Sequence, residues 1–543
     1  MKRLIPALTT IRTAAPPATR SLEALLALAL LACALLPGLS GAQAADKVVR
    51  IAPQSNLQVL DPTWTTATVT RSHGYMVYDT LFGIDAQGRI QPQMVDKWTV
   101  SPDRRTWSFT LREGLAFHDG QPVTAADVVA SIGRWSQKDA LGQRLAAATE
   151  RWEAVDARTA RLVLKDSFGL VLEALSKPGA YVPFILPKRV ADTPADKQIE
   201  DSTGSGPYIF KRDEWKPGSL VVYVKNPKYQ PRKEAPSGTA GGKRVYVDRV
   251  EWHILRDAQT QINALAKGEI DLVEQPAHEH YASLRANPDL TVHDGKHGAQ
   301  VILRFNHLQP PFDDVRVRRA ALAALSQEPF LKGQFVSSDL YRTCRSLYPC
   351  GSAYETNAGM DGLLGGNLKQ ARELLKASGY TGATVSIMQP TDLATVAKLP
   401  AVAAQQLRLA GFKTELVPMD WNASLARRQK KEPANQGGWS IFITTFNGLD
   451  LLNPVVNPAM NASGEKAWPG WPSDEALEKL RLEFLRAPDE AAKKKIAEAA
   501  QVRALEVGTH AALGEYFQPV VTRKALTGYL NAPVYLYWNL DKR

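Results

Sequence analysis

Hydrophobic and polar residues alternate regularly within "TWSFTLREGLAFHDGQPVTAADVVASIGRW", residues 106–135. Every second residue from Trp107 to Leu111 is apolar, which predicts a strand with one buried face. Thr124 lies three residues before Asp127, a variant of the capping box that begins a helix. Apolar residues then recur at helical spacing, so the stretch is predicted to fold as strand, turn and helix.

His118 and Asp119 lie in the predicted turn and form a pair that could transfer a proton. The glycine after them is a turn signal, and every residue around them has a place in the strand–turn–helix unit. We therefore interpret His118 as a turn residue and not as a catalytic one. The chain also lacks a G-x-S-x-G nucleophile elbow, so no catalytic residue is predicted.

Strands and helices alternate along the rest of the chain. A strand is predicted at 47–52, and a helix that ends at Gly268 precedes a strand with Ile270 and Leu272. After Gly298, strands are predicted at 384–388, 414–419 and 439–445, with helices capped by Asp313, closed by Gly379 and closed by Gly411. This order predicts a layered α/β fold.

The N-terminal region has the features of a secretory signal peptide. Basic residues precede an apolar run at 25–36, and small residues follow up to Ala44. The run is too short for a transmembrane helix, which needs about 20 apolar residues. We predict that residues 1–44 are removed and that the mature protein is periplasmic. The alternatives are a retained membrane anchor and a lipid anchor at Cys33, which ends a loose lipobox match.

The cysteines of the mature chain predict one disulfide and no metal site. Cys344 and Cys350 remain after the signal peptide is removed, and two cysteines this close in an exported protein indicate a small closed loop. A zinc site is not predicted, because these thiolates lack partner ligands at the right spacing. His278 and His280 in "HEHY" face opposite sides of a strand and do not match a helix-borne zinc pair. No cofactor is predicted.

The chain has 543 residues and a formal net charge of +11. The positive charge is dispersed, with local clusters at 427–431 and 493–495 that we interpret as solvated helix faces. Exported proteins rarely meet nucleic acid, so we expect no nucleic-acid partner.

The order of several short motifs indicates a family. They are "LDP" at 60–62, "MVYDTLFG" at 76–83, "WSFTLREGLAFHDGQPVTAADVVAS" at 107–131, "GSGPYIF" at 204–210, "KNPKYQ" at 225–230, "GEID" at 268–271, "PPFDDVRVRRA" at 310–320 and "ARELLKASGY" at 371–380. Together they resemble extracellular solute-binding protein family 5, the large bacterial binding proteins of peptide, nickel and opine ABC importers. The resemblance covers essentially the whole mature chain.

The resemblance implies a hinged, two-lobed, type II-like periplasmic binding protein that works as a monomer with ABC permease subunits. Lobe I would contain 45–84, 205–300 and 513–543, and an extra subdomain at 85–204 would be attached to it. Lobe II would span 301–512. The strand–turn–helix unit would then be scaffold within the extra subdomain.

Candidate ligand-binding residues follow the predicted strands. In open α/β sheets, ligands bind beyond the carboxyl ends of the strands, where rings provide apolar area and hydroxyls orient a polar ligand. This argument selects Trp64, Thr65, Thr66, Trp421, Phe446, Asn447, Gly448 and Asp450. Similarity to the family adds Arg144, whose loop is expected to approach the cleft, and Trp471 is a further candidate lining residue.

The stretch "TTFNGLD" differs from the pattern of dipeptide-binding relatives. Those relatives place an aspartate soon after a tryptophan, where it holds the ammonium group of the ligand. Here Phe446 takes the ring position and the carboxylate follows later, as Asp450. The difference argues against the usual ammonium clamp and against simple dipeptides as the ligands.

We therefore expect the ligand-capturing component of an ABC importer, for short peptides or a peptide-like amphoteric solute. One alternative is a periplasmic enzyme, such as a peptidase that uses His118 and Asp119. Another is a periplasmic chaperone or sensor receptor with the same fold.

Overall fold

The computed structural model describes residues 46–295, 298–487 and 489–543. The predicted signal peptide at 1–44, its cleavage after Ala44 and the alternative lipid anchor at Cys33 lie outside these residues. Within the described ranges, no helix is both long and apolar enough to cross a membrane.

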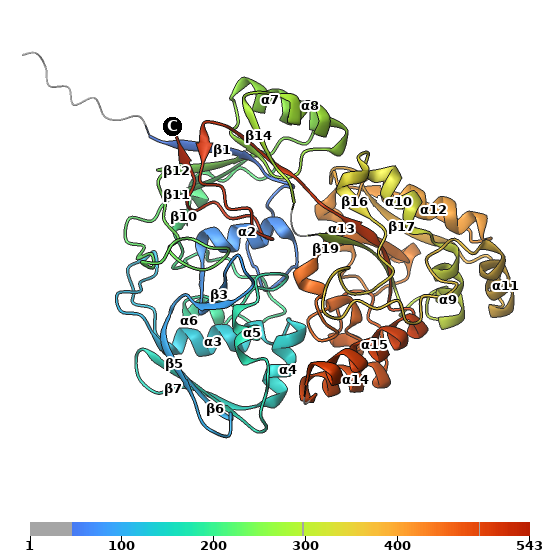
Figure 1. Cartoon of the computed structure of the whole chain (residues 1–543), viewed down its shortest axis with the longest axis horizontal. Helices are drawn as coiled ribbons and strands as arrows, with labels where there is room; N and C mark the ends of the chain where they lie inside the picture. The colour runs from blue at the N-terminus through green and yellow to red at the C-terminus, as the bar shows by residue number, and fades with distance from the viewer. Residues whose placement is uncertain (1–45, 296–297, 488) are drawn as a thin grey trace, which may run out of the picture. The chain divides into compact units, whose positions relative to one another are not determined.

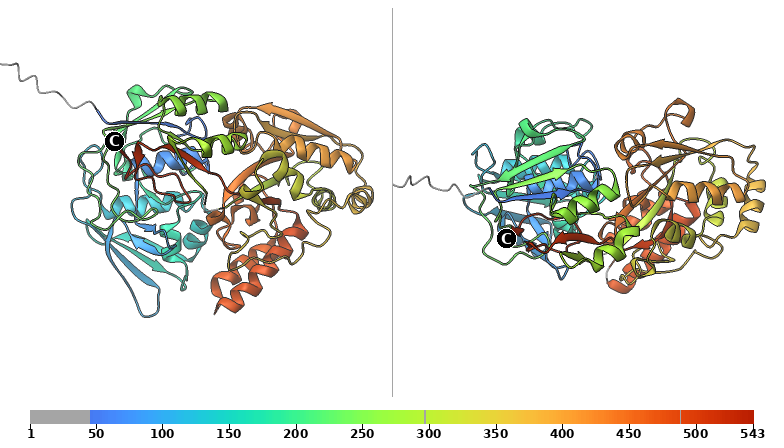
Figure 2. Two further views of the ribbon diagram at one scale, coloured as in Figure 1. Left: turned by 45° about the horizontal axis from the view of Figure 1, so that its top comes forward. Right: turned by 90° about the horizontal axis from the view of Figure 1, so that it is seen from above.

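The first sheet joins strands from distant parts of the chain. Its members are β1 (Val48–Ala52), β10 (Tyr208–Phe210), β11 (Leu220–Lys225), β12 (Arg249–His253), β13 (Leu272–Val273), β14 (Leu290–His293) and β21 (Val520–Arg523). They are ordered β10-β11-β12-β1-β13-β21-β14, and β1 runs parallel to both of its neighbours. The N-terminal strand, drawn in blue, thus lies among green strands in Figures 1 and 2.

The second sheet is formed by β15 (Ala299–Phe305), β16 (Tyr341–Arg342), β17 (Val385–Pro390), β18 (Thr414–Met419), β19 (Ile441–Asn447) and β20 (His510–Tyr516). Its order is β16-β20-β15-β19-β17-β18. β19 lies between β15 and β17, and Ile441, Phe442 and Ile443 are buried. This continuous apolar run is explained by burial on both faces of the strand.

The predicted strand–turn–helix unit is confirmed. The antiparallel sheet β5-β6-β8-β7 contains β5 (Val95–Val100), β6 (Thr106–Leu111), β7 (Thr149–Ala154) and β8 (Thr159–Leu164). Helix α3 (Ala125–Trp135) begins with the predicted capping box, in which Thr124 N–H and Oγ1–H donate to the carboxylate of Asp127, each at 2.7 Å. Three small sheets complete the strands: β2 (Asp79–Thr80) with β9 (Phe184–Ile185), β3 (Phe82–Ile84) with β4 (Ile90–Pro92), and β22 (Leu526–Thr527) with β23 (Asp541–Lys542).

His118 lies in the turn, as predicted, and its ring bonds to the backbone of a neighbouring segment. Its Nδ1 accepts a hydrogen bond from Gly204 N–H at 3.2 Å, and its Nε2–H donates to the carbonyl of Gly206 at 3.2 Å. Burial lowers the pKa of the ring to about 4, so the imidazole is neutral at pH 7. Asp119 pairs with Arg189 at 3.1 Å. His118 and Asp119 thus join the turn to the 204–206 segment and to the helix at Lys188–Ala191.

Helices cover the sheets and mostly end where the sequence predicts. They are α2 (Thr68–Val77), α4 (Ala140–Ala148), α5 (Val171–Ser176), α6 (Lys188–Ala191), α7 (Ala258–Lys267), α8 (Tyr281–Ala286), α9 (Val315–Ala324), α10 (Gln327–Gln334), α11 (Leu368–Ser378), α12 (Leu399–Leu409), α13 (Trp421–Arg427), α14 (Glu475–Arg486) and α15 (Glu490–Val507). Gly268 and Gly379 close α7 and α11 in the left-handed conformation that only glycine adopts without strain.

The predicted cap of α9 is wrong by one residue. Asp314, not Asp313, caps the helix, because its carboxylate accepts the N–H of Arg316 at 2.8 Å. The carboxylate of Asp313 accepts the N–H of Asp314 instead and therefore lies one residue too early. Gly411 closes α12 as predicted: it follows the C-cap Ala410 with φ = 104°, and its N–H donates to the carbonyl of Arg408 at 2.9 Å.

The chain passes between the two sheets at two places. β14 and β21 belong to the first sheet, and β15 and β20, which are next to them in the chain, belong to the second. The predicted lobe boundaries at 300/301 and 512/513 fall inside β15 and β20. All residues of a strand belong to the same sheet. Boundaries that leave β15 and β20 intact would therefore lie before Ala299 and after Tyr516.

Candidate functional site

A cavity of about 90 Å³ lies where residues from both sheets meet. We call it the tyrosine cavity, because Tyr516, Tyr529 and Tyr535 line it. Thr68 and Arg71 of α2 and Asn447 of β19 also contribute to its wall. Asn447 Nδ2 donates to the carbonyl of Pro533 at 2.6 Å, so β19 is attached here to the C-terminal segment.

Arg71 in this cavity faces a buried carboxylate. Its Nη1 lies 3.8 Å from Oδ2 of Asp450, and its buried Nε has no hydrogen-bond partner among the described residues. Oδ1 of Asp450 accepts the N–H of Ala180 at 2.6 Å. The carboxylate fits only because residue 179 is glycine, since a Cβ there would lie 1.7 Å from Oδ1. Asp450 thus joins the end of β19 to the 179–180 loop.

Glu274 lies directly after β13 and is fully buried. Its Oε2 accepts the N–H of Gln54 at 2.7 Å, and its Oε1 has no hydrogen-bond partner in the described chain. Burial raises the pKa of Glu274 to about 8, against a smaller lowering effect of the charge of Arg71. With Glu274 protonated at pH 7, Arg71 is the charged residue of the cavity lining, and Asp450 is its ion-pair partner.

A larger pocket of about 260 Å³ is lined by aromatic side chains. We call it the tryptophan pocket, because Trp64, Trp468 and Trp471 form its wall together with Tyr181. Its rim is cationic: Lys138 Nζ lies 5.5 Å from the ring centroid of Trp64, and Lys431 Nζ lies 5.7 Å from that of Trp471.

Two of these aromatic residues adopt a left-handed backbone. Tyr181 has φ = 53° and Trp471 has φ = 47°. For bulky residues this conformation is unfavourable by about 1–3 kcal/mol and tends to occur at functional sites. The strained backbone of Tyr181 and Trp471 therefore makes the tryptophan pocket a candidate functional site.

Arg428 lies beside this pocket, next in sequence to the lining residue Gln429. It follows α13 and donates from Nη2 to Thr66 Oγ1 at 3.1 Å and to Thr65 Oγ1 at 3.5 Å. Its guanidinium carbon lies 5.6 Å from the ring centroid of Trp468. Burial lowers the pKa of Arg428 to about 10, which leaves it charged at pH 7.

The structure brings several predicted site residues together. Trp64 and Trp471 line the tryptophan pocket, Thr65 and Thr66 contact Arg428 beside it, and Asn447 lines the tyrosine cavity. Contact of any of them with a ligand stays a prediction.

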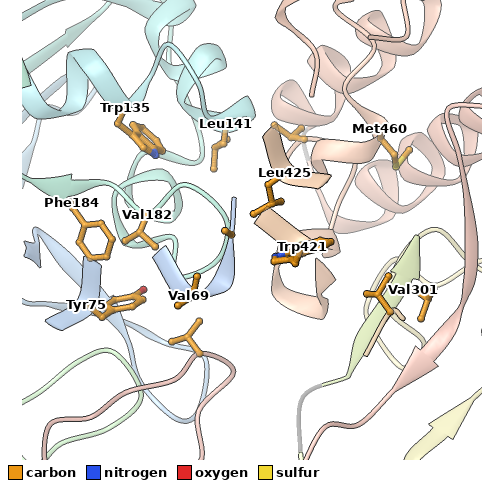
Figure 3. Packing of buried hydrophobic residues seen from close by; sticks show 14 of the residues in the cluster. Val69, Tyr75, Trp135, Leu141, Val182, Phe184, Val301, Trp421, Leu425 and Met460 are labelled. Carbon is orange, nitrogen blue, oxygen red and sulfur yellow. The ribbon is translucent and has the colours of Figure 1, made fainter. Parts of the chain in front are cut away.

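Other predicted residues do not line either space. Phe446 is buried against Trp468, with ring centroids 5.1 Å apart, and Arg144 forms an ion pair with Glu478 of α14. Trp421 begins α13 and is buried with Leu425, as Figure 3 shows. These side chains pack against residues that are distant in sequence, so local sequence patterns could not predict where they point.

Gly448 and Asp450 contact other parts of the protein and do not line either pocket. Gly448 N–H donates to the carbonyl of Gly298 at 2.8 Å, and a Cβ at 448 would lie 3.0 Å from that oxygen. The carboxylate of Asp450 accepts the N–H of Ala180 and lies 3.8 Å from Arg71, and its contact with a ligand stays a prediction.

Sequence reasoning missed Arg71, Glu274, Arg428 and Trp468. Arg428 belongs to the cluster 427–431 that was interpreted as a solvated helix face, and this interpretation is wrong for Arg428, which is 2% exposed. Trp468 lies in the same "WPGW" motif as Trp471, so the motif itself was a usable signal. Arg71 and Glu274 carry no local signal.

Comparisons with known proteins identify the family. The model of the bacterial extracellular solute-binding proteins, family 5, matches residues 89–468. The chain belongs to this family. It is 39% identical over 515 residues to a probable peptide ABC transporter periplasmic-binding protein, y4tO, of Sinorhizobium fredii, covering 93% of this chain and 96% of that one. It is 27% identical over 406 residues to the glutathione-binding protein GsiB of Salmonella typhi, covering 73% and 75%.

Solved structures of family 5 proteins share the fold. The binding protein AgaA from A. tumefacien R10 in complex with agropinic acid has a TM-score of 0.77 at 22% identity, over 91% of this chain and 99% of that one. DppA from Helicobacter pylori in complex with the peptide STSA has a TM-score of 0.77 at 21% identity, over 91% and 98%. The predicted two-lobed α/β fold is therefore confirmed, and this family 5 chain is a substrate-binding protein of the ABC-importer type.

Proposed function

We propose that this chain captures a short peptide or a peptide-like amphoteric solute between two lobes and delivers it to a membrane permease. One lobe would contain the first sheet with the subdomain at 85–204, and the other would contain the second sheet. The observation that carries the proposal is the tryptophan pocket, whose strained Tyr181 and Trp471 lie at the junction of segments from both. Its volume of about 260 Å³ is close to the lower end of the roughly 300–1,000 Å³ usual for small-molecule sites.

The chemistry of the site supports a solute with both polar and apolar parts. Three indole rings and Tyr181 offer flat apolar surface, while the lysines at the rim and Arg428 offer positive charge. The tyrosine cavity adds hydroxyl groups near Arg71, which can orient the polar end of a solute. A relative named for glutathione binding and a related fold solved in complex with agropinic acid are consistent with this class of ligand.

Closure of the lobes would follow from differential affinity. A ligand that contacts both lobes binds the closed state more tightly than the open state and shifts the population toward it. The contacts of Asp450 with Ala180 and of Arg428 with Thr66 connect segments of both proposed lobes, so they would form on closure.

The remaining parts of the proposal concern location and partners. We propose an exported periplasmic monomer that catalyses no reaction, binds no nucleic acid and docks on ABC permease subunits. The sulfur atoms of Cys344 and Cys350 are paired and their Cα atoms lie 5.8 Å apart, which is compatible with a disulfide in an oxidising compartment.

A thermal-shift screen tests the proposal. The purified mature chain is heated with dipeptides, tripeptides, glutathione, agropinic acid and mannopinic acid. A ligand present at 100 times its Kd stabilises the folded state by about 2.7 kcal/mol, which raises the Tm measurably. The absence of a shift with every solute would overturn the proposal. Mass spectrometry of the same incubations reports peptide cleavage, which would favour the alternative of an enzyme.

A further inference from the structure

Arg428 stands out among the buried arginines of the described chain, which are Arg134, Arg304, Arg318, Arg428 and Arg481. Arg134 makes two hydrogen bonds to the carboxylate of Asp61, at 3.1 and 2.6 Å. Arg481 bonds to Glu478, and the guanidinium groups of Arg304 and Arg318 donate to several backbone carbonyls. Each of these four charges is therefore matched by anionic or strongly polar acceptors.

Arg428 has no such match. Its guanidinium reaches only the hydroxyls of Thr65 and Thr66, and its buried Nε has no hydrogen-bond partner. Its other close neighbours are the rings of Trp468 and Phe442, whose centroids lie 5.6 and 5.9 Å from the guanidinium carbon, and neither ring supplies a carboxylate. An unpaired buried charge with an unsatisfied donor is unfavourable, so its presence calls for an acceptor that the chain does not supply.

The surroundings of Arg428 open onto the tryptophan pocket. Trp468, whose ring centroid lies 5.6 Å from the guanidinium carbon, lines the pocket, and so does the next residue, Gln429. The Nε1–H of Trp468 is also buried without a partner in the described structure. Two unsatisfied donors, one of them charged, therefore lie beside a pocket with flat aromatic walls.

The acidic residues of the pocket do not balance this charge. Asp139 forms an ion pair with Lys177, and Glu465 lies 3.7 Å from Lys431 at the exposed rim. With both carboxylates paired in this way, the two lysines of the lining, Lys138 and Lys466, have no ion-pair partner within 4.0 Å among the described residues.

We infer that Arg428 anchors a carboxylate of the captured solute in the tryptophan pocket, with the apolar part next to that carboxylate lying against Trp468. The inference deepens the proposed function and rests on it. It assigns acidic solutes as the preferred class, recognised by an arginine of the α13 end and not by the Asp450 region. The carboxylate can be the terminus of a peptide or an acidic side group, because both present the same two oxygens to a guanidinium.

Matched acid and neutral probes test the inference. The acids are the dipeptide Ala-Phe, with a terminal carboxylate, and glutathione, which also has a side-group carboxylate. Their partners are Ala-Phe amide and glutathione diethyl ester, in which each carboxylate is replaced by an uncharged amide or ester; these are called the neutral probes for that group. Calorimetric titration of the wild-type chain is expected to give tighter binding of at least one acid than of its partner, by about 10- to 100-fold, as for a hydrogen bond to a charged group.

Substitutions then locate the anchor. Arg428→Gln is expected to reduce the affinity for the acid about 10- to 100-fold and to bring the acid-to-neutral ratio close to one. Arg428→Lys keeps the charge but loses the two parallel hydrogen bonds of a guanidinium. Its acid-to-neutral affinity ratio is expected to lie between that of the wild type and that of Arg428→Gln. Arg319→Gln, the same change on the exposed side of α9, is the matched control and should leave both affinities unchanged.

Several outcomes overturn the inference while leaving the proposed function intact. They are equal binding of acid and neutral probes by the wild type, binding of neither probe pair while other solutes of the screen bind, and an unchanged acid-to-neutral ratio in Arg428→Gln. A purely structural Arg428 would give the last result, with a lower Tm before any solute is added. If Arg428→Gln does not fold, the ratio measured for Arg428→Lys decides in the same way. A wild-type chain that binds no solute of the screen overturns both proposals.

Discussion

The tyrosine cavity and the tryptophan pocket are both lined by residues from distant parts of the chain, but positive charge is balanced differently at each. In the cavity, Arg71 faces the carboxylate of Asp450, which also accepts the N–H of Ala180. Beside the pocket, Arg428 donates only to hydroxyl groups and has an unsatisfied Nε–H. The first arginine therefore has a counter-charge within the fold, whereas the second has none among the described residues. Under our proposals, Arg71 and Asp450 would stabilise the fold and Arg428 would select the solute.

The largest expected effect comes from removing the wall of the tryptophan pocket. Trp468 is buried, and its ring centroid lies 5.0 Å from that of Phe442 and 5.1 Å from that of Phe446. Trp468→Ala should lower the free energy of unfolding by about 3–5 kcal/mol, because it leaves a cavity in this aromatic cluster. Urea denaturation measures the loss. Trp98→Ala, at a ring that is 39% exposed, is the control, and an equal loss there would contradict a close-packed pocket wall.

The second largest effect tests the cavity. Asp450→Ala removes the acceptor of the Ala180 N–H and leaves Arg71 without its carboxylate. We expect the free energy of unfolding to fall by about 2–4 kcal/mol, since a buried donor and a buried charge lose their partner.

Urea denaturation at pH 7 provides this measurement as well. Asp361→Ala removes an exposed carboxylate and should leave stability unchanged. A loss no greater than that of Asp361→Ala would show that Asp450 is not a stabilising contact and would remove the contrast between cavity and pocket.

A smaller and pH-dependent effect is expected at Glu274. Its pKa is raised by burial to about 8, so the folded state holds a proton that the unfolded state releases near pH 4.5. Between these two values, stability falls as pH rises, because the folded state binds more protons. Glu274→Gln, which keeps an oxygen for the Gln54 N–H, should be more stable than the wild type by roughly 1–3 kcal/mol at pH 8.

The difference between Glu274→Gln and the wild type should shrink as pH is lowered from 8 to 5. Thermal denaturation of both proteins across this range measures it. A difference that is constant with pH would mean that Glu274 does not change its protonation on unfolding.

The smallest expected change is in the stability of Arg428→Met. Replacing a buried charge that lacks a carboxylate partner with an apolar side chain of similar length should change the free energy of unfolding by less than about 1 kcal/mol. The result is measured without solute by urea denaturation. A loss as large as that of Asp450→Ala would contradict the comparison, because Arg428 would then have a balanced structural role like Arg71.

Local patterns were sufficient for much of the fold. The alternation at Trp107–Leu111 and the Thr124 capping box predicted β6 and α3, because a strand face and a helix start are set by residues within one or two turns of chain. Cap positions were less certain: Asp313 and Asp314 have the same side chain, and only the backbone conformation decides which one caps α9.

The candidate site was predicted only in part. Trp64, Thr65, Thr66, Asn447 and Trp471 were selected because they follow predicted strands or belong to an aromatic motif, and the structure places each at or beside one of the two spaces. Trp421 and Phe446 met the same criteria but are buried by packing. Whether a ring after a strand faces a pocket or the core depends on its neighbours in space, which are distant in sequence.

The sequence by itself determined the order of strands and helices, the turn role of His118 and, through the motifs it contains, the family. These properties depend on short-range periodicity, caps and turn residues, which act over a few positions. Only the tertiary structure decided that Asp450 accepts from Ala180, 270 residues away, and that Arg428 lies against Thr66 without a carboxylate. The physical reason is that burial and charge pairing are properties of the surroundings in space, so the same arginine is a solvated residue in one environment and an anion site in another.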